Sequence, residues 1–185
     1  MDPLDAYRGL RARVDAHEHA AFARGADLRC GAGCEACCHV DLEVAPIEAA
    51  DVLSALEALS DEALAALVSR LPRDDGRCVM LDDEGRCDVY EVRPLVCRSQ
   101  GMALAYPDDL IPVEAVRARA GDKALVWCPL NFTERPPTGP DVLDAGRLDE
   151  ALALLNRAFV GSDDPLERVA LRDLVALAAQ ERTPG

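Results

Sequence analysis

Eight cysteines set the strongest constraint on this 185-residue chain, because they occur in groups rather than scattered. A compact N-terminal group is followed by three more widely spaced cysteines and then by a single one. In chain order they are Cys30, Cys34, Cys37, Cys38, Cys78, Cys87, Cys97 and Cys128. Three or four thiolates that converge within a few ångströms repel one another unless a cation neutralises them. The pattern therefore predicts a metal site, and all eight cysteines are its candidate ligands.

The first group has the densest spacing. If its backbone turns helically, its four cysteines lie at i, i+4, i+7 and i+8, which is one helical face. Gly31 and Gly33 argue against a complete helix. A turn from Cys34 alone still places Cys34, Cys37 and Cys38 side by side, so we expect these thiols to converge.

Residues 78–90 predict a β-hairpin around the turn-forming sequence Asp82–Gly85. A four-residue turn places Met80 opposite Cys87. Cys78 then lies diagonally across the ladder from Cys87 on the same face, about 7–8 Å away. Both sulfurs could serve one site in this register, whereas a bulge would change the register and undo this arrangement.

Disulfides or buried free thiols are the alternative interpretation of these cysteines. The first residues, Met1–Asp5, contain no basic n-region, and no apolar h-region follows, so we expect no export and a cytoplasmic protein. Thiols stay reduced in that compartment. Neighbouring Cys37 and Cys38 are also poorly placed to bond each other. These points favour metal ligands over disulfides.

Composition limits the partners of the chain. A net charge of -14 repels phosphate groups, so we expect no nucleic-acid partner and no anionic membrane surface. No stretch approaches the ~18 apolar residues of a membrane span. Half of the residues are hydrophobic, and the length suits one packed domain.

The hydrophobic periodicity predicts a mostly α fold with a small β-hairpin element. We expect one metal-stapled domain over residues 1–185, with a cysteine-cluster core over 30–128 between helical flanks at 3–25 and 148–180. The other expected elements are a strand at 41–44, helices at 46–59, 60–71 and 91–99, and, within the C-terminal flank, helices at 148–160 and from Asp164-Pro165 to Gln180. Proline-rich residues 100–145 have no assigned element.

Charged residues beside the cysteines give a further indication. Four arginines each adjoin a cysteine in this acidic chain: Arg29, Arg77, Arg86 and Arg98. Guanidinium groups near a sulfur favour thiolate over thiol. His39 follows Cys38 and could be an additional ligand, but a surface or hydrogen-bonded role is favoured. His17 and His19 lie two residues apart on a helix and cannot share a face, so we assign them no role.

The segment Cys30–Cys38 has the signature CxxxCxxCC, and the whole arrangement resembles the YkgJ-type cysteine-cluster family of zinc- or iron-chelating proteins. Residues 78–90 resemble the second block of that family, residues 93–98 resemble its Arg-Pro-x-x-Cys block, and Cys128 resembles its last cysteine. The resemblance spans 30–128 and takes in all eight cysteines in order. The family includes a domain of flagellin lysine methylases, which implies that the cluster can support methyl transfer. This chain lacks the larger remainder of such an enzyme, so that activity is not carried over.

The triplet Cys30-x3-Cys34-x2-Cys37 also has the spacing of the radical-SAM loop. That fold needs repeated strand–helix units, which this sequence lacks. We therefore do not assign the chain to it.

The donor type narrows the choice of metal. Thiolate-only ligation suits zinc or an iron–sulfur cluster and disfavours magnesium, calcium and copper(II). Eight cysteines divide into two tetrahedral zinc sites, or into one four-cysteine cluster with accessory thiols. Typical structural zinc sites use separated C-x2-C pairs, so the compact group with its Cys-Cys doublet favours an iron–sulfur cluster, [4Fe–4S] in particular.

Two functions follow from these two metals. The first is an iron–sulfur protein in electron or group transfer, acting with a protein partner that the sequence does not identify. The alternative is a zinc-binding structural or metal-handling module without catalysis. The sequence has no Gly-rich phosphate loop, no H-E-x-x-H and no serine-nucleophile motif, so it does not decide whether the protein is an enzyme.

Overall fold

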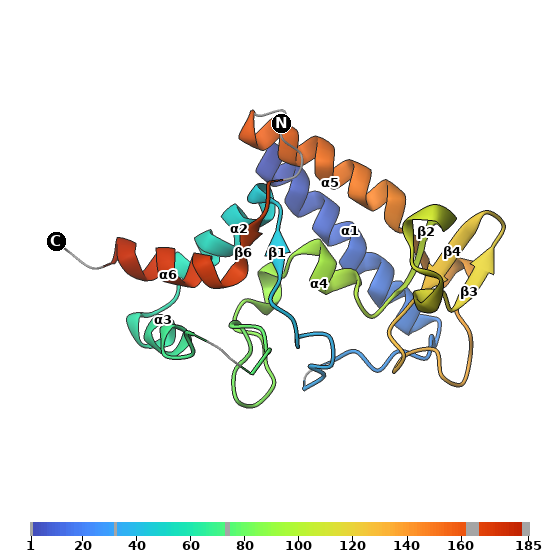
Figure 1. Ribbon diagram of the computed structural model, residues 1–185, viewed down its shortest axis with the longest axis horizontal. Coiled ribbons are helices and arrows are strands. Elements are labelled where there is room, and N and C mark those ends of the chain that lie inside the picture. The colour runs from blue at the N-terminus through green and yellow to red at the C-terminus, as the bar shows by residue number, and fades with distance from the viewer. Residues whose placement is uncertain (1, 32, 73–74, 162–166, 183–185) are drawn as a thin grey trace. The chain divides into compact units, whose positions relative to one another are not determined.

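The computed structural model describes residues 2–31, 33–72, 75–161 and 167–182. It is rich in helices and has two small sheets (Figure 1), as the sequence predicts in outline. The chain divides into two compact units. Unit 1 comprises Asp5–Cys30 and Leu95–Leu155, and unit 2 comprises Asp2–Leu4, Gly31–Pro94 and Asn156–Gly185. A single domain over 1–185 stays a prediction.

Helix α1, Pro3–Ala23, confirms the N-terminal helix expected over residues 3–25. Its buried residues are Tyr7, Leu10, Val14 and Ala21, which follow the 3.6-residue period of one helical face. Gly25 ends the helix in the left-handed region at φ 75°, and the N–H of Ala26 donates to the carbonyl of Ala21.

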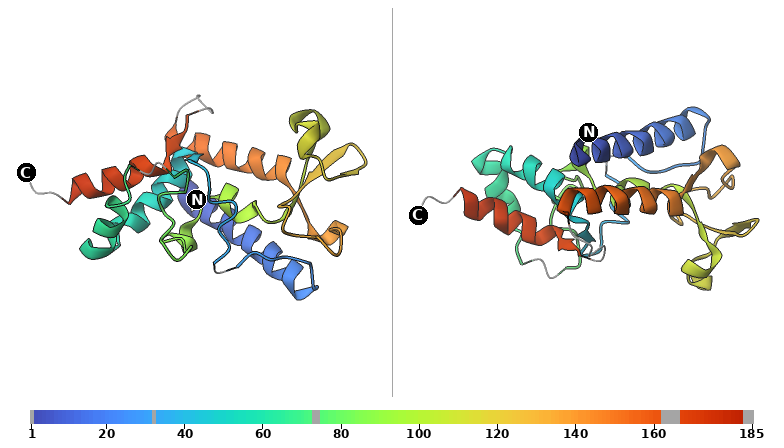
Figure 2. Two further views of the ribbon diagram at one scale, coloured as in Figure 1. Left: turned by 60° about the horizontal axis from the view of Figure 1, so that its bottom comes forward. Right: turned by 90° about the horizontal axis from the view of Figure 1, so that it is seen from above.

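A four-stranded sheet in unit 1 lies beside the C-terminal end of α1 (Figures 1 and 2). Its strands are β2 (Ala103–Pro107), β3 (Ala118–Ala120), β4 (Lys123–Val126) and β5 (Val142–Asp144), in the order β3-β4-β2-β5. Strand β2 pairs antiparallel with β4 and parallel with β5. The sequence did not predict this sheet. Its strands are three to five residues long and lie in a proline-rich part of the chain, so each hydrophobic pattern is too short to recognise.

Helix α4, Leu95–Ser99, belongs to unit 1 and corrects the single helix predicted over 91–99. The structure has a one-turn 3-10 helix at Tyr90–Val92 and then α4. Arg93 between them is extended, with ψ 134°. Pro94 explains the break, because a residue before proline is disfavoured in the helical region.

The two helices between residues 46 and 68 begin where their capping residues predict. Helix α2, Pro46–Glu57, has proline in its first turn, and Glu48 Oε2 accepts the N–H of Ala45 at 3.1 Å. Helix α3, Asp61–Val68, starts at Ser60, whose hydroxyl accepts the N–H of Ala63. Both helices end two to three residues before the predicted positions.

The C-terminal flank differs from the prediction. Helix α5, Ala145–Val160, ends at Gly161 as expected. The last helix, α6, covers Leu171–Glu181 rather than starting at Asp164-Pro165, which lies outside the described residues. Strand β6, Val169–Ala170, comes directly before it and pairs with β1, Glu43–Val44. This pairing holds the backbone extended until Leu171 and delays the helix.

The predicted hairpin is present as a tight turn with one isolated bridge, and its predicted register is wrong by one residue. Leu81, not Met80, lies opposite Cys87. The side chain of Asp82 accepts the N–H groups of Glu84 and Arg86, which builds an extra residue into the turn. The bulged alternative is therefore the one that the structure adopts.

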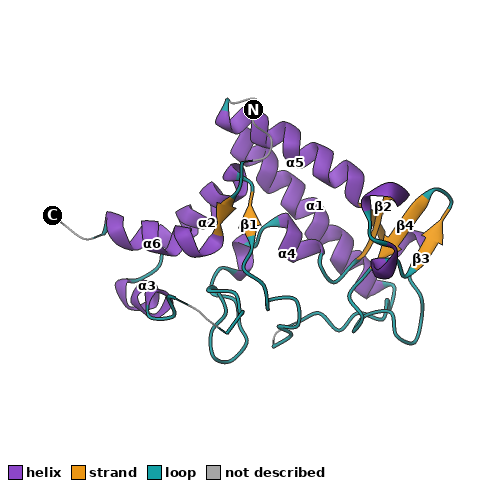
Figure 3. Cartoon of the chain, in the orientation of Figure 1, coloured by secondary structure: helices purple, strands orange, loops and turns teal. Residues whose placement is uncertain are grey.

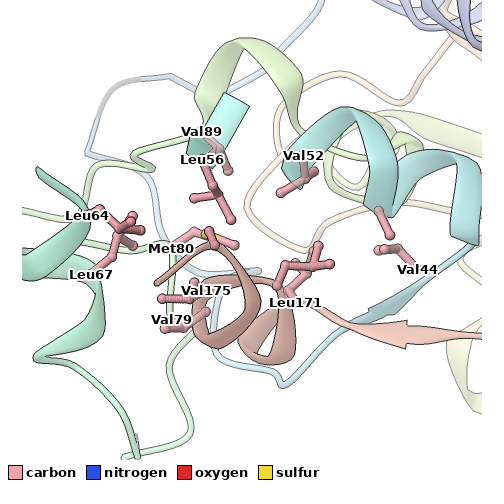
Figure 4. Packing of buried hydrophobic residues seen from close by; sticks show 13 residues of the cluster. Val44, Val52, Leu56, Leu64, Leu67, Val79, Met80, Val89, Leu171 and Val175 are labelled. Carbon is pink, nitrogen blue, oxygen red and sulfur yellow. The ribbon is translucent and has the colours of Figure 1, made fainter. Parts of the chain in front are cut away.

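The hairpin is anchored in the hydrophobic core of unit 2. Figure 4 shows Val79, Met80 and Val89 packed among leucine and valine side chains of α2, α3 and α6. Cys78 and Cys87 pack against the same cluster. The core thus fixes both cysteines of the hairpin. Among the described helices, none has the length and apolar character needed to cross a membrane.

Candidate metal centre

All eight cysteines lie in the described part of the chain, and none of them forms a disulfide. Unit 2 holds Cys34, Cys37, Cys38, Cys78 and Cys87, and unit 1 holds Cys30, Cys97 and Cys128. The cysteine-bearing segments of unit 2 are loops (Figure 3). The first group forms short turns rather than a helix.

Cys37 and Cys38 form a pair of interacting thiols. Hydrogen bonding between the two side chains raises the pKa of Cys37, and the negative charge of an ionised Cys38 raises it further. Cys37 is exposed, whereas Cys38 is partly buried. The doublet therefore presents two sulfurs together, at a place that solvent reaches.

Cys78 and Cys87 form the second pair. Burial raises the pKa of Cys87 to about 11, and repulsion from an ionised Cys78 contributes to the increase. A backbone hydrogen bond connects the two pairs, because the N–H of Cys78 donates to the carbonyl of Cys38 at 2.7 Å. Two segments separated by forty residues of sequence therefore meet at their cysteines.

Arg93 supplies positive charge to both pairs. Its guanidinium lowers the pKa values of Cys37 and Cys87, in each case against larger effects that raise them. The side chain lies over the ring of Tyr90, with 3.7 Å from Cζ to the ring centroid, and its Nε donates to the Tyr90 carbonyl. Sequence adjacency missed this role, because Arg93 lies four residues from the nearest cysteine.

Of the four arginines that adjoin a cysteine, one joins two cysteine segments. Arg77 Nη2 donates to Glu35 Oε2 at 2.7 Å, and Glu35 lies within the first cysteine group. Arg77 Nε is buried and has no hydrogen-bond partner among the described residues. Arg86 instead binds carboxylates of its own turn, and Arg98 pairs with Asp15 of α1.

In unit 1, Asn131 organises the surroundings of Cys30. It is 1% exposed, and its Nδ2 donates to Cys30 Sγ at 3.2 Å and to the Gly101 carbonyl at 2.6 Å. Its Oδ1 accepts the N–H of Arg29, and its own N–H donates to the carbonyl of Cys128. One buried amide therefore connects three distant parts of the chain. No motif in the sequence indicated Asn131.

Gly101 allows this close packing. A Cβ added there would lie 2.1 Å from Cys30 Sγ, closer than any real contact. Only glycine leaves room for the sulfur at this position.

The thiols form pairs rather than a preformed metal cage. Among the residues described, no three His, Cys, Asp or Glu side chains lie close enough together to hold a metal ion. His39 is near Glu35, with 3.5 Å between Nε2 and Oε1, which agrees with the role favoured from sequence. The donor chemistry does fit zinc or an iron–sulfur cluster, because the backbones of the two thiol pairs meet and Arg93 supplies positive charge to both.

In this structure, loops bring pairs of thiols together and an arginine lies near them. This arrangement is typical of a cysteine-cluster protein. Comparison with protein families agrees: the model named CxxCxxCC, described as a putative zinc- or iron-chelating domain, matches residues 29–129. The match covers more than half of the chain, so this protein belongs to that family, as the resemblance predicted. No curated protein and no solved structure gives a significant match.

Proposed function

We propose that this protein binds a metal through the thiolates of unit 2, with Cys37, Cys38, Cys78 and Cys87 as its principal ligands. The observation that carries the proposal is the 2.7 Å hydrogen bond from the N–H of Cys78 to the carbonyl of Cys38, which joins the two thiol pairs. Membership of a family described as zinc- or iron-chelating supports it.

Ligation resolves an electrostatic conflict between these thiols. Each pair resists ionisation, because a hydrogen bond with Cys38 raises the pKa of Cys37, burial raises the pKa of Cys87, and an ionised neighbour adds to both increases. A bound cation removes that repulsion, so metal binding and deprotonation occur together. The sulfurs must also move closer together than the described positions place them, so part of the binding energy orders the two loops.

The metal group favoured here is an iron–sulfur cluster used in electron or group transfer. Its proposed support is the all-thiolate donor set with the adjacent Cys37–Cys38 doublet. When bound, such a cluster supplies one-electron chemistry. Arg93 would offset part of its negative charge, and the exposure of Cys37 gives an external partner access to the site.

The proposal extends to the other four cysteines. Cys34 lies in the same loop as the doublet, and Cys30, Cys97 and Cys128 belong to unit 1, where we propose them as further ligands. A reducing, cytoplasmic location belongs to the same proposal, because the ligands must remain reduced.

Zinc is the second candidate. Two pairs of cysteines make up the four thiolates of a tetrahedral zinc site, and such a site would be structural or metal-handling. Optical absorption and elemental analysis of anaerobically purified protein separate the candidates. Broad visible absorption with iron and acid-labile sulfide supports the cluster, and a colourless protein with stoichiometric zinc supports the alternative. Protein that carries and takes up neither metal would overturn the proposal.

A further inference from the structure

An ion pair joins the two cysteine-bearing segments of unit 2. Glu35 lies between Cys34 and Cys37, and Arg77 directly precedes Cys78. Their charged groups meet at 2.7 Å, and their side chains are only 33% and 20% exposed. Glu35 lies two residues before Cys37, and Arg77 lies one residue before Cys78, so the contact is placed to control how the two thiol pairs approach each other.

Each partner is fixed on its own side of the contact. Arg77 Nη2 also donates to the Asp82 carbonyl at 3.3 Å, which ties the guanidinium to the hairpin turn. Gly85, in the left-handed region at φ 75°, leaves space for the carboxylate: a Cβ there would lie 3.1 Å from Glu35 Oε2. The hairpin is therefore shaped to receive Glu35.

Arg77 has one donor that these contacts do not use. Its Nε is buried and has no acceptor among the described residues. A buried donor of a charged group without an acceptor is costly, and native structures rarely retain one without a reason. A metal-bound thiolate sulfur is a hydrogen-bond acceptor, and Cys78 directly follows Arg77 in the chain.

We propose that Glu35 and Arg77 are positioning residues of the thiolate centre. Glu35 orients the guanidinium, the ion pair holds the two cysteine segments together, and Arg77 Nε donates a hydrogen bond to a metal-bound thiolate sulfur of unit 2. The inference rests on the proposed metal function and assigns two residues that the cysteine pattern does not include.

Arg86 provides a matched control. It also directly precedes a cysteine, Cys87, and it also forms ion pairs, with Asp82 at 2.9 Å and with Glu84. Both partners belong to its own turn, and its side chain is 65% exposed. Arg86 therefore resembles Arg77 in sequence context and charge but does not connect the two segments.

The test compares the full-length wild type with Arg77→Gln, Arg77→Lys, Glu35→Gln and Arg86→Gln. Metal per protein is measured after anaerobic purification, and the rate of metal loss to excess EDTA is followed. Loss of a hydrogen-bonding partner of a metal ligand typically weakens binding by roughly 10–100-fold. We expect a loss of that size for Arg77→Gln, a smaller one for Glu35→Gln, and a change below about twofold for Arg86→Gln.

Two further measurements separate positioning of the sulfur from stabilisation of the loops. Arg77→Lys keeps a positive charge but has no Nε donor, so it should rescue the thermal stability of the metal-free protein but not its metal retention. The thiolate-to-metal absorption band should also shift in Arg77→Gln and Arg77→Lys, and not in Arg86→Gln. A purely structural ion pair would leave that band unmoved.

The outcomes keep the two proposals distinct. A wild-type protein that binds neither iron nor zinc overturns the proposed function, and this inference with it. A wild type that binds metal, with Arg77→Gln retaining it as well as Arg86→Gln does, overturns the inference alone. If Arg77→Gln does not fold, the same comparison is made with Arg77→Lys, which preserves the positive charge, and with Glu35→Gln, which preserves the shape of the side chain.

Discussion

The two units hold their cysteines in different ways. In unit 2, thiols lie beside thiols, and ionisation of one opposes ionisation of the next. In unit 1, the Cys30 sulfur instead accepts a hydrogen bond from the neutral amide of Asn131, at 3.2 Å. The first arrangement is electrostatically incomplete without a cation, whereas the second has a buried partner already in place.

This difference indicates where a metal matters most. Like charges in a partly buried site are costly, so thiolates in unit 2 gain most from a bound cation. The surroundings of Cys30 are held by packing and by hydrogen bonds, which do not depend on metal. We therefore expect unit 2 to depend on metal for its order more than unit 1 does.

The largest effect is expected from Cys78→Ser. The variant removes a sulfur next to the hydrogen bond that joins the thiol pairs, so it should release the metal of unit 2 and lower the melting temperature. The loss should exceed the roughly 10–100-fold change in affinity typical of outer-shell substitutions. Elemental analysis and thermal unfolding measure both.

Cys128→Ser in unit 1 is the comparison for Cys78→Ser. As a proposed ligand it should also reduce the metal content, but with a smaller change in melting temperature. Equal losses of metal and of melting temperature in the two variants would mean that both units depend on metal to the same extent. That result would contradict the proposed difference between the units.

Gly101→Ala tests the packing of unit 1. The new Cβ would meet Cys30 Sγ at 2.1 Å, so the sulfur must move away from its place beside Asn131. Overpacking of this kind costs about 1–3 kcal/mol. Chemical denaturation of the metal-free protein should show this loss.

Gly139→Ala is its control, because a Cβ at Gly139 would meet nothing within 4 Å. If Gly101→Ala is as stable as Gly139→Ala, the close contact with Cys30 does not restrict residue 101 to glycine.

Alkaline pH should destabilise the metal-free protein, because the thiols of unit 2 lose their protons. Folding raises the pKa of Cys87 from its ordinary value of 9.0 to about 11 and raises that of Cys37 as well. The folded state therefore favours the neutral thiols. That contribution to stability is complete below pH 9 and is lost as the pH rises towards 11.

Denaturation of the reduced metal-free protein across this pH window measures the loss. The metal-loaded protein should lack the effect, because its thiols are already deprotonated. A metal-free protein with constant stability between these pH values would argue against the burial of Cys87 and the thiol contacts in unit 2.

The smallest effect is expected from His39→Ala. The side chain of His39 is 48% exposed and contacts Glu35 at 3.5 Å, so metal content should stay at the wild-type value. Stability should change by no more than about 0.5 kcal/mol. A clear drop in metal per protein would make His39 a ligand and would add an imidazole to the unit 2 site.

Several helices were predictable from sequence because their signals are local. The buried period of α1 and the hydroxyl cap at Ser60 each lie within a few residues of what they specify. The hairpin register was not predictable from turn length, because the side chain of Asp82 added a residue to the turn. Local patterns therefore predict the secondary-structure elements, whereas side-chain hydrogen bonds determine the register of the hairpin.

The surroundings of the cysteines depended on contacts that sequence spacing does not show. Asn131 binds Cys30 across 101 positions of the chain, and Arg77 meets Glu35 across 42. Arg93 acts on two thiols although no cysteine adjoins it. A buried amide or an arginine has no spacing signature, so only the folded chain identifies these residues.

Metal analysis of the wild type beside a variant with Cys37, Cys38, Cys78 and Cys87 all replaced by serine tests the central claim most directly. Both proteins are purified anaerobically, and iron, acid-labile sulfide and zinc are measured per chain. We predict bound metal in the wild type and loss of the larger share of it in the variant. Equal metal content in the two proteins would contradict the assignment of the metal centre to unit 2.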